Sequence, residues 1–110
     1  MRPQTARELW GVLVEVLPGF AKDCPAEEIE SDATMHSVMR DFTPYFSGNL
    51  ERFSEKQLRS LGSFLNEAVS VDDDLENAVG TCFLEHLHQV RSYKALAPFL
   101  STIAKSKTHA

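Results

Sequence analysis

The stretch from Ser70 to Val90, SVDDDLENAVGTCFLEHLHQV, decides the fold of this chain. Its apolar residues recur at steps of three and four, the spacing of a helix that is buried on one side. These positions are Leu75, Ala78, Val79, Cys82, Phe83, Leu87 and Val90. Asp72, Asp73 and Asp74 precede them, where the unpaired N–H groups of a first helical turn favour negative charge. The stretch therefore predicts a central helix of an all-α core with a strongly negative start.

Four other segments have the same period, so we expect about five helices. The sequence TARE at residues 5–8 has the spacing of a capping box, and Pro18-Gly19 ends the helix that it begins. SEKQ at residues 54–57 is a second capping box, before the third helix. Gly62 lies inside that helix and costs about 1 kcal/mol relative to Ala, so we expect it to permit a close helix–helix approach.

The second helix follows an acidic connection, residues 21–32. Ser31 or Asp32 is suited to cap it, because both side chains accept hydrogen bonds from the first turn. Pro44, and then Gly48-Asn49, bring it to a close, since proline lacks the N–H that a helix interior needs.

Pro98 complicates the fifth helix, whose apolar pattern begins near Ser92. Either the helix proper starts near Ala97 after a turn, or it is kinked at the proline. The polar residues 105–110 are expected to fray. Together the segments predict one helical domain over residues 1–110, either a compact antiparallel bundle or a short HEAT-like stack of helix pairs.

Composition limits the function. The net charge is −5 and the pI about 5.3, which argue against binding nucleic acid through phosphate neutralisation and favour a basic protein partner. No apolar stretch approaches the roughly 20 residues of a membrane span, so we expect no membrane association. The N-terminal apolar run is interrupted by Glu8 and Glu15, unlike a secretory signal, and the cytoplasm is the expected compartment.

Two cysteines, Cys24 and Cys82, are too few for a disulfide framework, although a single bridge between them stays open. Cys82 lies on the apolar stripe and is expected to be a core thiol. Cys82 and His86 are four residues apart and can face one site, but zinc requires at least one further ligand. We therefore predict no metal and no cofactor.

No motif typical of nucleophilic, phosphate-binding or dinucleotide-binding sites is present, so we predict no catalytic residues and no enzyme activity. The acids are the candidate partner-binding residues. In one interpretation the three aspartates are helix caps; in the other they form a docking face. The proposed contact residues are Asp72, Asp73, Asp74 and Glu76, a second group of Glu27, Glu28 and Glu30, and Tyr45 as an aromatic surface anchor.

The run from Leu58 to Leu87, with LRSLGSFLNEAV and then LENAVGTCFLEHL, resembles a group of small bacterial helical proteins. Their N-A-V-x-T-C-F-L-E motif follows a short acidic turn, and most have no assigned activity. The resemblance implies a HEAT-like helix pair and structural roles for Asn77, Cys82, Phe83 and Glu85. Some members resemble immunity proteins, which protect a cell from a toxin.

The favoured hypothesis is a non-enzymatic, cytosolic immunity protein that covers a basic toxin domain with its acidic face. One alternative is an adaptor or chaperone for a secreted effector, which would use an apolar groove between helices. Another is a small structural homodimer, so the chain is expected to be a monomer or a homodimer. A small enzyme or metal sensor at Cys82 and His86 is the least favoured hypothesis.

Overall fold

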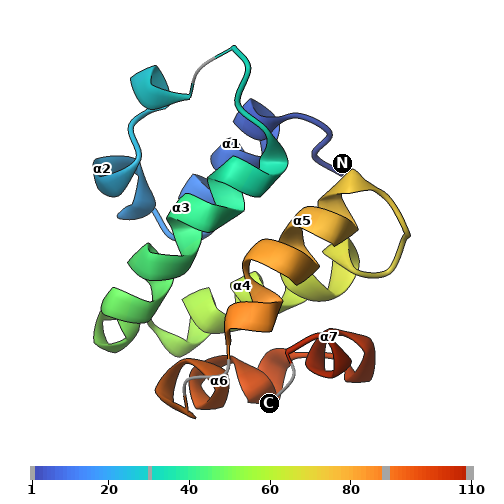
Figure 1. Cartoon of the computed structure of the whole chain (residues 1–110). Helices are drawn as coiled ribbons and strands as arrows, with labels where there is room; N and C mark the ends of the chain where they lie inside the picture. Colours follow the sequence, from blue (N-terminus) through green and yellow to red (C-terminus); the bar gives the residue numbers. More distant parts are fainter. Residues whose placement is uncertain (1, 30, 88–89, 109–110) are drawn as a thin grey trace.

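The computed structural model describes residues 2–29, 31–87 and 90–108, without the side chain of Val90. Within these ranges the chain is helical and has no strand, which confirms the all-α prediction (Figure 1). The α-helices are α1 (Ala6–Val16), α2 (Phe20–Asp23), α3 (Met35–Gly48), α4 (Glu55–Ala68), α5 (Asp74–Cys82), α6 (Val90–Leu96) and α7 (Thr102–Ser106). Short 3₁₀ turns are η1 (Ala26–Glu28), η2 (Leu50–Arg52), η3 (Leu84–His86) and η4 (Ala97–Phe99).

The helix starts follow local capping chemistry. Thr5 accepts a hydrogen bond from the Glu8 backbone N–H at α1, and Ser54 and Gln57 form the predicted capping box at α4. The start of α3 differs from the prediction. Its cap is Thr34, not Ser31 or Asp32, because Thr34 and Ser37 satisfy each other's backbone N–H groups.

Two predicted helix stops were wrong. Pro44 lies inside α3, on its exposed side, and does not end the helix. The helix continues to Gly48, with Asn49 as its C-cap, so the predicted stop at Gly48-Asn49 is confirmed. Burial of aromatic side chains on the opposite side offsets the hydrogen bond that the proline removes. The predicted helix from Ser70 to Val90 ends instead at Cys82, where Phe83 leaves helical geometry and η3 follows.

The C-terminal segment also differs from the prediction. Pro98 is neither in a kinked helix nor just inside a new α-helix, because α6 ends at Leu96 and the proline lies in η4. Residues 105–108 are not frayed: Lys107 contacts α5, and Thr108 is fully buried. The prediction for residues 109–110 lies outside the described residues.

An aromatic cluster fills the core beside α3. Phe42 meets Phe20 edge-on, with ring centroids 5.1 Å apart, and Phe83 lies 5.5 Å from Phe42. The Phe46 and Phe53 rings stack at 5.5 Å. This packing joins α2, α3 and the end of α5, and α5 has its most extensive contacts with α3.

Segments α6, η4 and α7 lie together across one side of the α4 and α5 pair (Figure 1). Gly62 of α4 permits this approach: a Cβ atom there would lie 2.6 Å from Phe99 Cβ and 2.8 Å from the Phe99 carbonyl oxygen. Asn66 joins the same elements, because its side chain donates to Phe99 O at 2.9 Å and accepts from the Ser101 N–H at 2.7 Å. The expected close approach at Gly62 is confirmed, with the 3₁₀ turn η4 as the neighbour instead of an α-helix.

Candidate binding face on helix α5

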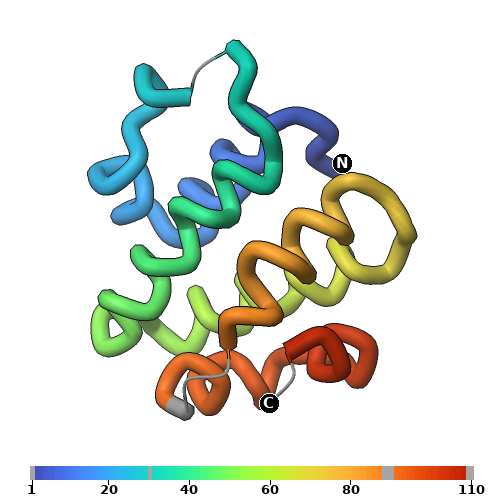
Figure 2. The backbone as a smooth tube through the Cα atoms, in the orientation of Figure 1, coloured from blue at the N-terminus to red at the C-terminus, as the bar shows by residue number. Residues whose placement is uncertain are grey.

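The N-terminus of α5 is held by an ion pair with the start of the chain. Asp73 caps the helix by accepting from the Glu76 backbone N–H at 3.0 Å. Arg2 donates to both Asp73 carboxylate oxygens, at 2.7 and 2.8 Å. The same guanidinium donates to the carbonyl oxygens of Glu67 and Ala68 at the end of α4. The first described residues therefore run beside the loop between α4 and α5 (Figure 2).

These contacts set the protonation of Asp73. Arg2, and after it the Glu76 backbone N–H, lower the pKa of Asp73 to about 2 from its ordinary 3.8. The carboxylate is thus charged throughout the neutral range, and its charge is matched within the molecule.

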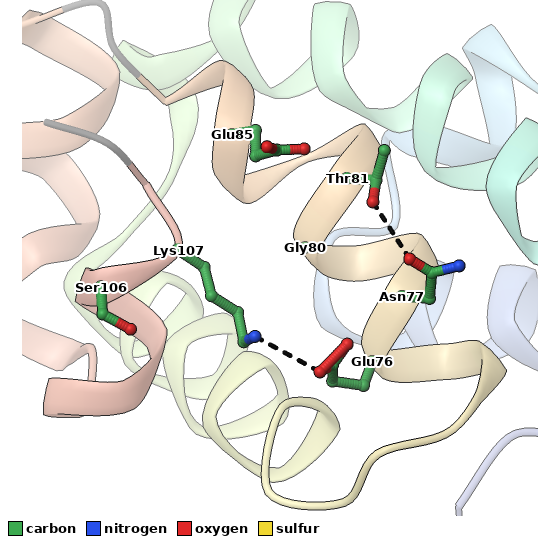
Figure 3. Close-up of a pocket in the computed structure, with 7 residues that line it drawn as sticks. All are labelled: Glu76, Asn77, Gly80, Thr81, Glu85, Ser106 and Lys107. Carbon is green, nitrogen blue, oxygen red and sulfur yellow. Dashed lines mark hydrogen bonds and ion pairs between the residues drawn. The ribbon is translucent and has the colours of Figure 1, made fainter.

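A second ion pair holds α5 from its other side. Lys107 Nζ, just after α7, lies 3.3 Å from Glu76 Oε2 (Figure 3). Its side chain crosses Gly80, where a Cβ would meet Lys107 Cδ at an ordinary 3.6 Å. Two of the four predicted contact acids at α5, Asp73 and Glu76, therefore have structural partners.

The exposed side of α5 is a polar stripe. Asp74, Asn77 and Thr81 are exposed at helical spacing, and exposed Glu85 follows in η3. Thr81 donates to Asn77 Oδ1 at 3.2 Å along this stripe (Figure 3). A hollow of about 370 Å³ lies beside it, between α5 and α7; its lining residues are Glu76, Asn77, Gly80, Thr81, Glu85, Ser106 and Lys107. We call Asp72, Asp74, Asn77, Thr81 and Glu85 the α5 face.

The second acidic group lies elsewhere. Glu27 and Glu28 are exposed in η1, which is separated from the start of α5 by α3 (Figure 1). Glu30 lies outside the described residues. Glu27 and Glu28 therefore lie on a different part of the surface from the acids of α5.

Tyr45 is not the predicted surface anchor. Its side chain is only 8% exposed, and its ring packs 5.5 Å from Phe20 and 5.8 Å from Phe53. Burial, followed by the nearby Asp23 charge, raises the pKa of its hydroxyl. The helical period places Tyr45 beside Phe42 and Phe46 on the inner side of α3, and that side is core.

The pairing of Cys82 with His86, the least favoured of the sequence hypotheses, is not formed. Cys82 is partly rather than fully buried, and its Sγ lies 3.4 Å from Nδ1 of His36 on α3, whereas His86 is exposed in η3. Both cysteines are free. Across the described ranges, no three His, Cys, Asp or Glu side chains are grouped to hold a metal ion.

Sequence reasoning missed three side chains that contact α5 from distant segments: Arg2, Lys107 and His36. One feature of the sequence pointed to cations such as Arg2 and Lys107. The Ser70–Val90 stretch has acids but no Lys or Arg, so any cation that pairs with these acids comes from another segment. No such feature pointed to His36, because nothing in its neighbourhood along the chain indicates Cys82.

Within the described part of the chain, no helix has the length and apolar character to span a membrane.

Comparison with known proteins gives a family and no activity. Neither the curated proteins nor the solved structures include a match. A family model described as a domain of unknown function, DUF7674, matches residues 11–106, which include α3, α4 and α5 but neither Arg2 nor Lys107. The chain therefore belongs to the DUF7674 family, whose function is unassigned.

Proposed function

We propose that this chain is a non-enzymatic protein-binding domain that docks a basic protein partner on the α5 face. The observation that carries the proposal is the placement of exposed polar side chains on α5. Asp74, Asn77 and Thr81 face solvent on one side, while Leu75, Ala78 and Val79 are buried on the other. A helix anchored in this way presents its exposed side rigidly, which limits the entropy lost on binding.

The charge of this surface favours a basic partner. Asp72 and Asp74 are exposed, and the residues from Ser70 to Leu87 include no Lys or Arg. The partner's cations would meet these carboxylates at the rim, where they accelerate association more than they tighten the complex. The net charge of −5 has the same sign and adds long-range attraction.

The specific form that we propose is a cytosolic immunity protein that neutralises a bacterial toxin. Its support is the resemblance of the LENAVGTCFLEHL segment to small helical proteins of this kind, together with the acidic surface. In this proposal the α4 and α5 helices act as a HEAT-like pair, and α7 braces that pair through Lys107.

An adaptor with an apolar groove is the less supported alternative. One groove between α1 and α4 has an apolar side of Val12, Val16 and Pro18, but its other lining residues are Glu15, Lys56, Gln57 and Ser60. Among the described residues, the large apolar side chains that are exposed are Val71 and Ile103. These do not make the contiguous apolar patch that an adaptor or a homodimer would present.

The test starts with capture of the partner. The full chain is immobilised, incubated with lysate from the cells that encode it, and the captured protein is identified by mass spectrometry and purified. Association rates are then measured for wild type, D72N/D74N and the control E27Q/E28Q. The control removes the same charge from η1, away from the α5 face.

We expect D72N/D74N to slow association by about tenfold or more at low salt, with a weaker salt dependence, because rim charges steer encounter. E27Q/E28Q should change the rate much less. If the two double variants slowed association equally, the effect would come from net charge alone, and the proposal that the partner docks on the α5 face would be refuted. An immunity role further requires that co-expression rescues cells from growth arrest caused by the partner; a harmless partner would refute it.

A further inference from the structure

A chain of hydrogen bonds crosses from α5 to α3 and back, and it ends on a sulfur atom. Thr81 Oγ1 donates to Asn77 Oδ1 at 3.2 Å. The Asn77 amide nitrogen lies 3.5 Å from His36 Nε2, and His36 Nδ1 lies 3.4 Å from Cys82 Sγ. Four polar side chains from two helices are therefore aligned.

The first of these contacts sets the direction of the others. Because the Thr81 hydroxyl occupies Asn77 Oδ1, the amide presents its Nδ2–H groups to His36. Nε2 then accepts, so the ring proton lies on Nδ1 and points at Cys82 Sγ. The chain of donors thus runs toward the sulfur, and the imidazole N–H is placed to hydrogen-bond Cys82 Sγ when the sulfur acts as a nucleophile.

The position of Cys82 in its helix makes this contact important. Cys82 is the last residue of α5, where the terminal carbonyl groups of a helix offer a sulfur no hydrogen-bond donor. The imidazole N–H of His36 supplies that donor from α3.

The other cysteine provides an internal contrast. Cys24 is buried, 4% exposed, and burial, together with the charges of Asp41, Glu28 and Asp23, raises the pKa of its thiol. Cys82 is partly exposed and has a nitrogen donor beside it. The two thiols of one molecule thus differ in both access and environment.

We propose that Cys82 is a modification site that forms a mixed disulfide with a low-molecular-weight disulfide, and that His36 is the positioning residue whose imidazole N–H hydrogen-bonds the attacking sulfur. The Cys82 thiolate attacks one sulfur of the small disulfide. A new Sγ–S bond forms and the original S–S bond breaks, and the departing thiolate takes a proton from solvent. The small disulfide is itself the oxidant: Cys82 is oxidised, and the half of the disulfide that departs is reduced to a thiol. No further oxidant is needed.

The probe for the test is glutathione disulfide, added to the folded full chain, and the readout is intact-mass and peptide mass spectrometry over time. Wild type and C24S should each gain one glutathionyl group at Cys82, at equal rates, and C82S should gain none in the same time. H36A should form the adduct about tenfold more slowly, the order expected when a thiolate loses a charge-assisted hydrogen bond.

Two further variants separate activation from packing. H36N retains a short N–H donor near the sulfur and should recover part of the rate, whereas N77A, which removes the contact to Nε2, should lose part of it. In denaturant all variants that retain Cys82 should react equally at that residue. Preferential labelling of Cys24, or H36A reacting as fast as wild type while circular dichroism shows it folded, would overturn the proposal.

Discussion

Gly62 provides the sharpest test of the packing, because one methyl group there has opposite effects on the helix and on its neighbours. In an isolated helix, G62A would stabilise α4 by about 1 kcal/mol, since alanine is the better helix former. In this fold the new Cβ would lie 2.6 Å from Phe99 Cβ and 2.8 Å from Phe99 O. The latter is a backbone atom, and it moves only if η4 moves.

The magnitude follows from these two terms. Overpacking of this kind costs about 1–3 kcal/mol. A shift of η4 also weakens the hydrogen bond from Asn66 to Phe99 O, which is worth about 1 kcal/mol. After subtraction of the gain in helix propensity, we expect G62A to lower the free energy of unfolding by about 1–3 kcal/mol.

Gly11 supplies the matched control. It lies in α1, is exposed, and a Cβ there would meet nothing within 4 Å. G11A should therefore raise the free energy of unfolding by up to about 1 kcal/mol. The same substitution thus has opposite signs at two helical positions.

Urea unfolding followed by far-ultraviolet circular dichroism measures both effects, and equal m-values would show that the unfolded states are comparable. In thermal unfolding, each kcal/mol corresponds to a shift of roughly 4–8 °C in Tm. If G62A were as stable as wild type, the close approach of η4 to α4 would be refuted. If G11A were destabilising as well, the propensity argument would fail.

Other contacts give predictions of the same kind. Because Arg2 is the main cause of the low pKa of Asp73, R2A should raise that pKa from about 2 toward 3.8. Carbon-13 NMR titration of the carboxyl group measures the change, and an unchanged pKa would show that the backbone N–H alone sets it. Since the pKa is depressed in the folded state, the stabilisation that Asp73 provides is present above about pH 4 and is lost as the pH falls through about 2; acid unfolding of D73N, whose cap no longer titrates, should lack this component. N66A removes both hydrogen bonds that join α4 to the η4–α7 segment and should cost about 2 kcal/mol in urea unfolding, whereas N66D, which keeps the acceptor for the Ser101 N–H, should cost less; equal losses would contradict the assigned amide orientation.

What could be predicted from the sequence was the chemistry that acts over three or four residues. The caps at Thr5, Ser54 and Asp73 follow from side chains that reach their own first turn. The stop at Pro18-Gly19 and the special role of Gly62 are local in the same sense. The true cap of α3 is also local, but its Ser37 is a less familiar partner than Glu or Gln.

The sequence predictions that were wrong concern residues whose surroundings are set by tertiary packing. Pro44 is a helix breaker by local rules, but the buried rings of Phe42 and Phe46 on either side of it keep α3 continuous. Tyr45 was predicted to be exposed because a tyrosine suits both a core and a surface. Among the candidate site residues, the sequence identified the acids of α5 but not their partners, since Arg2 and Lys107 are brought to the helix only by the complete fold.

The ion pair between Arg2 and Asp73 also has a consequence for the order of assembly. The two residues are 71 positions apart, and the entropy cost of closing so long a loop grows with its length. The contact therefore forms late in folding, after the neighbouring helices α3, α4 and α5 have packed. In native-state hydrogen exchange, the N-terminal arm should open before those helices. Such opening would release Asp73 from Arg2 at the first turn of α5, so a binding partner that contacts this turn would be coupled to the closing of the N-terminal residues.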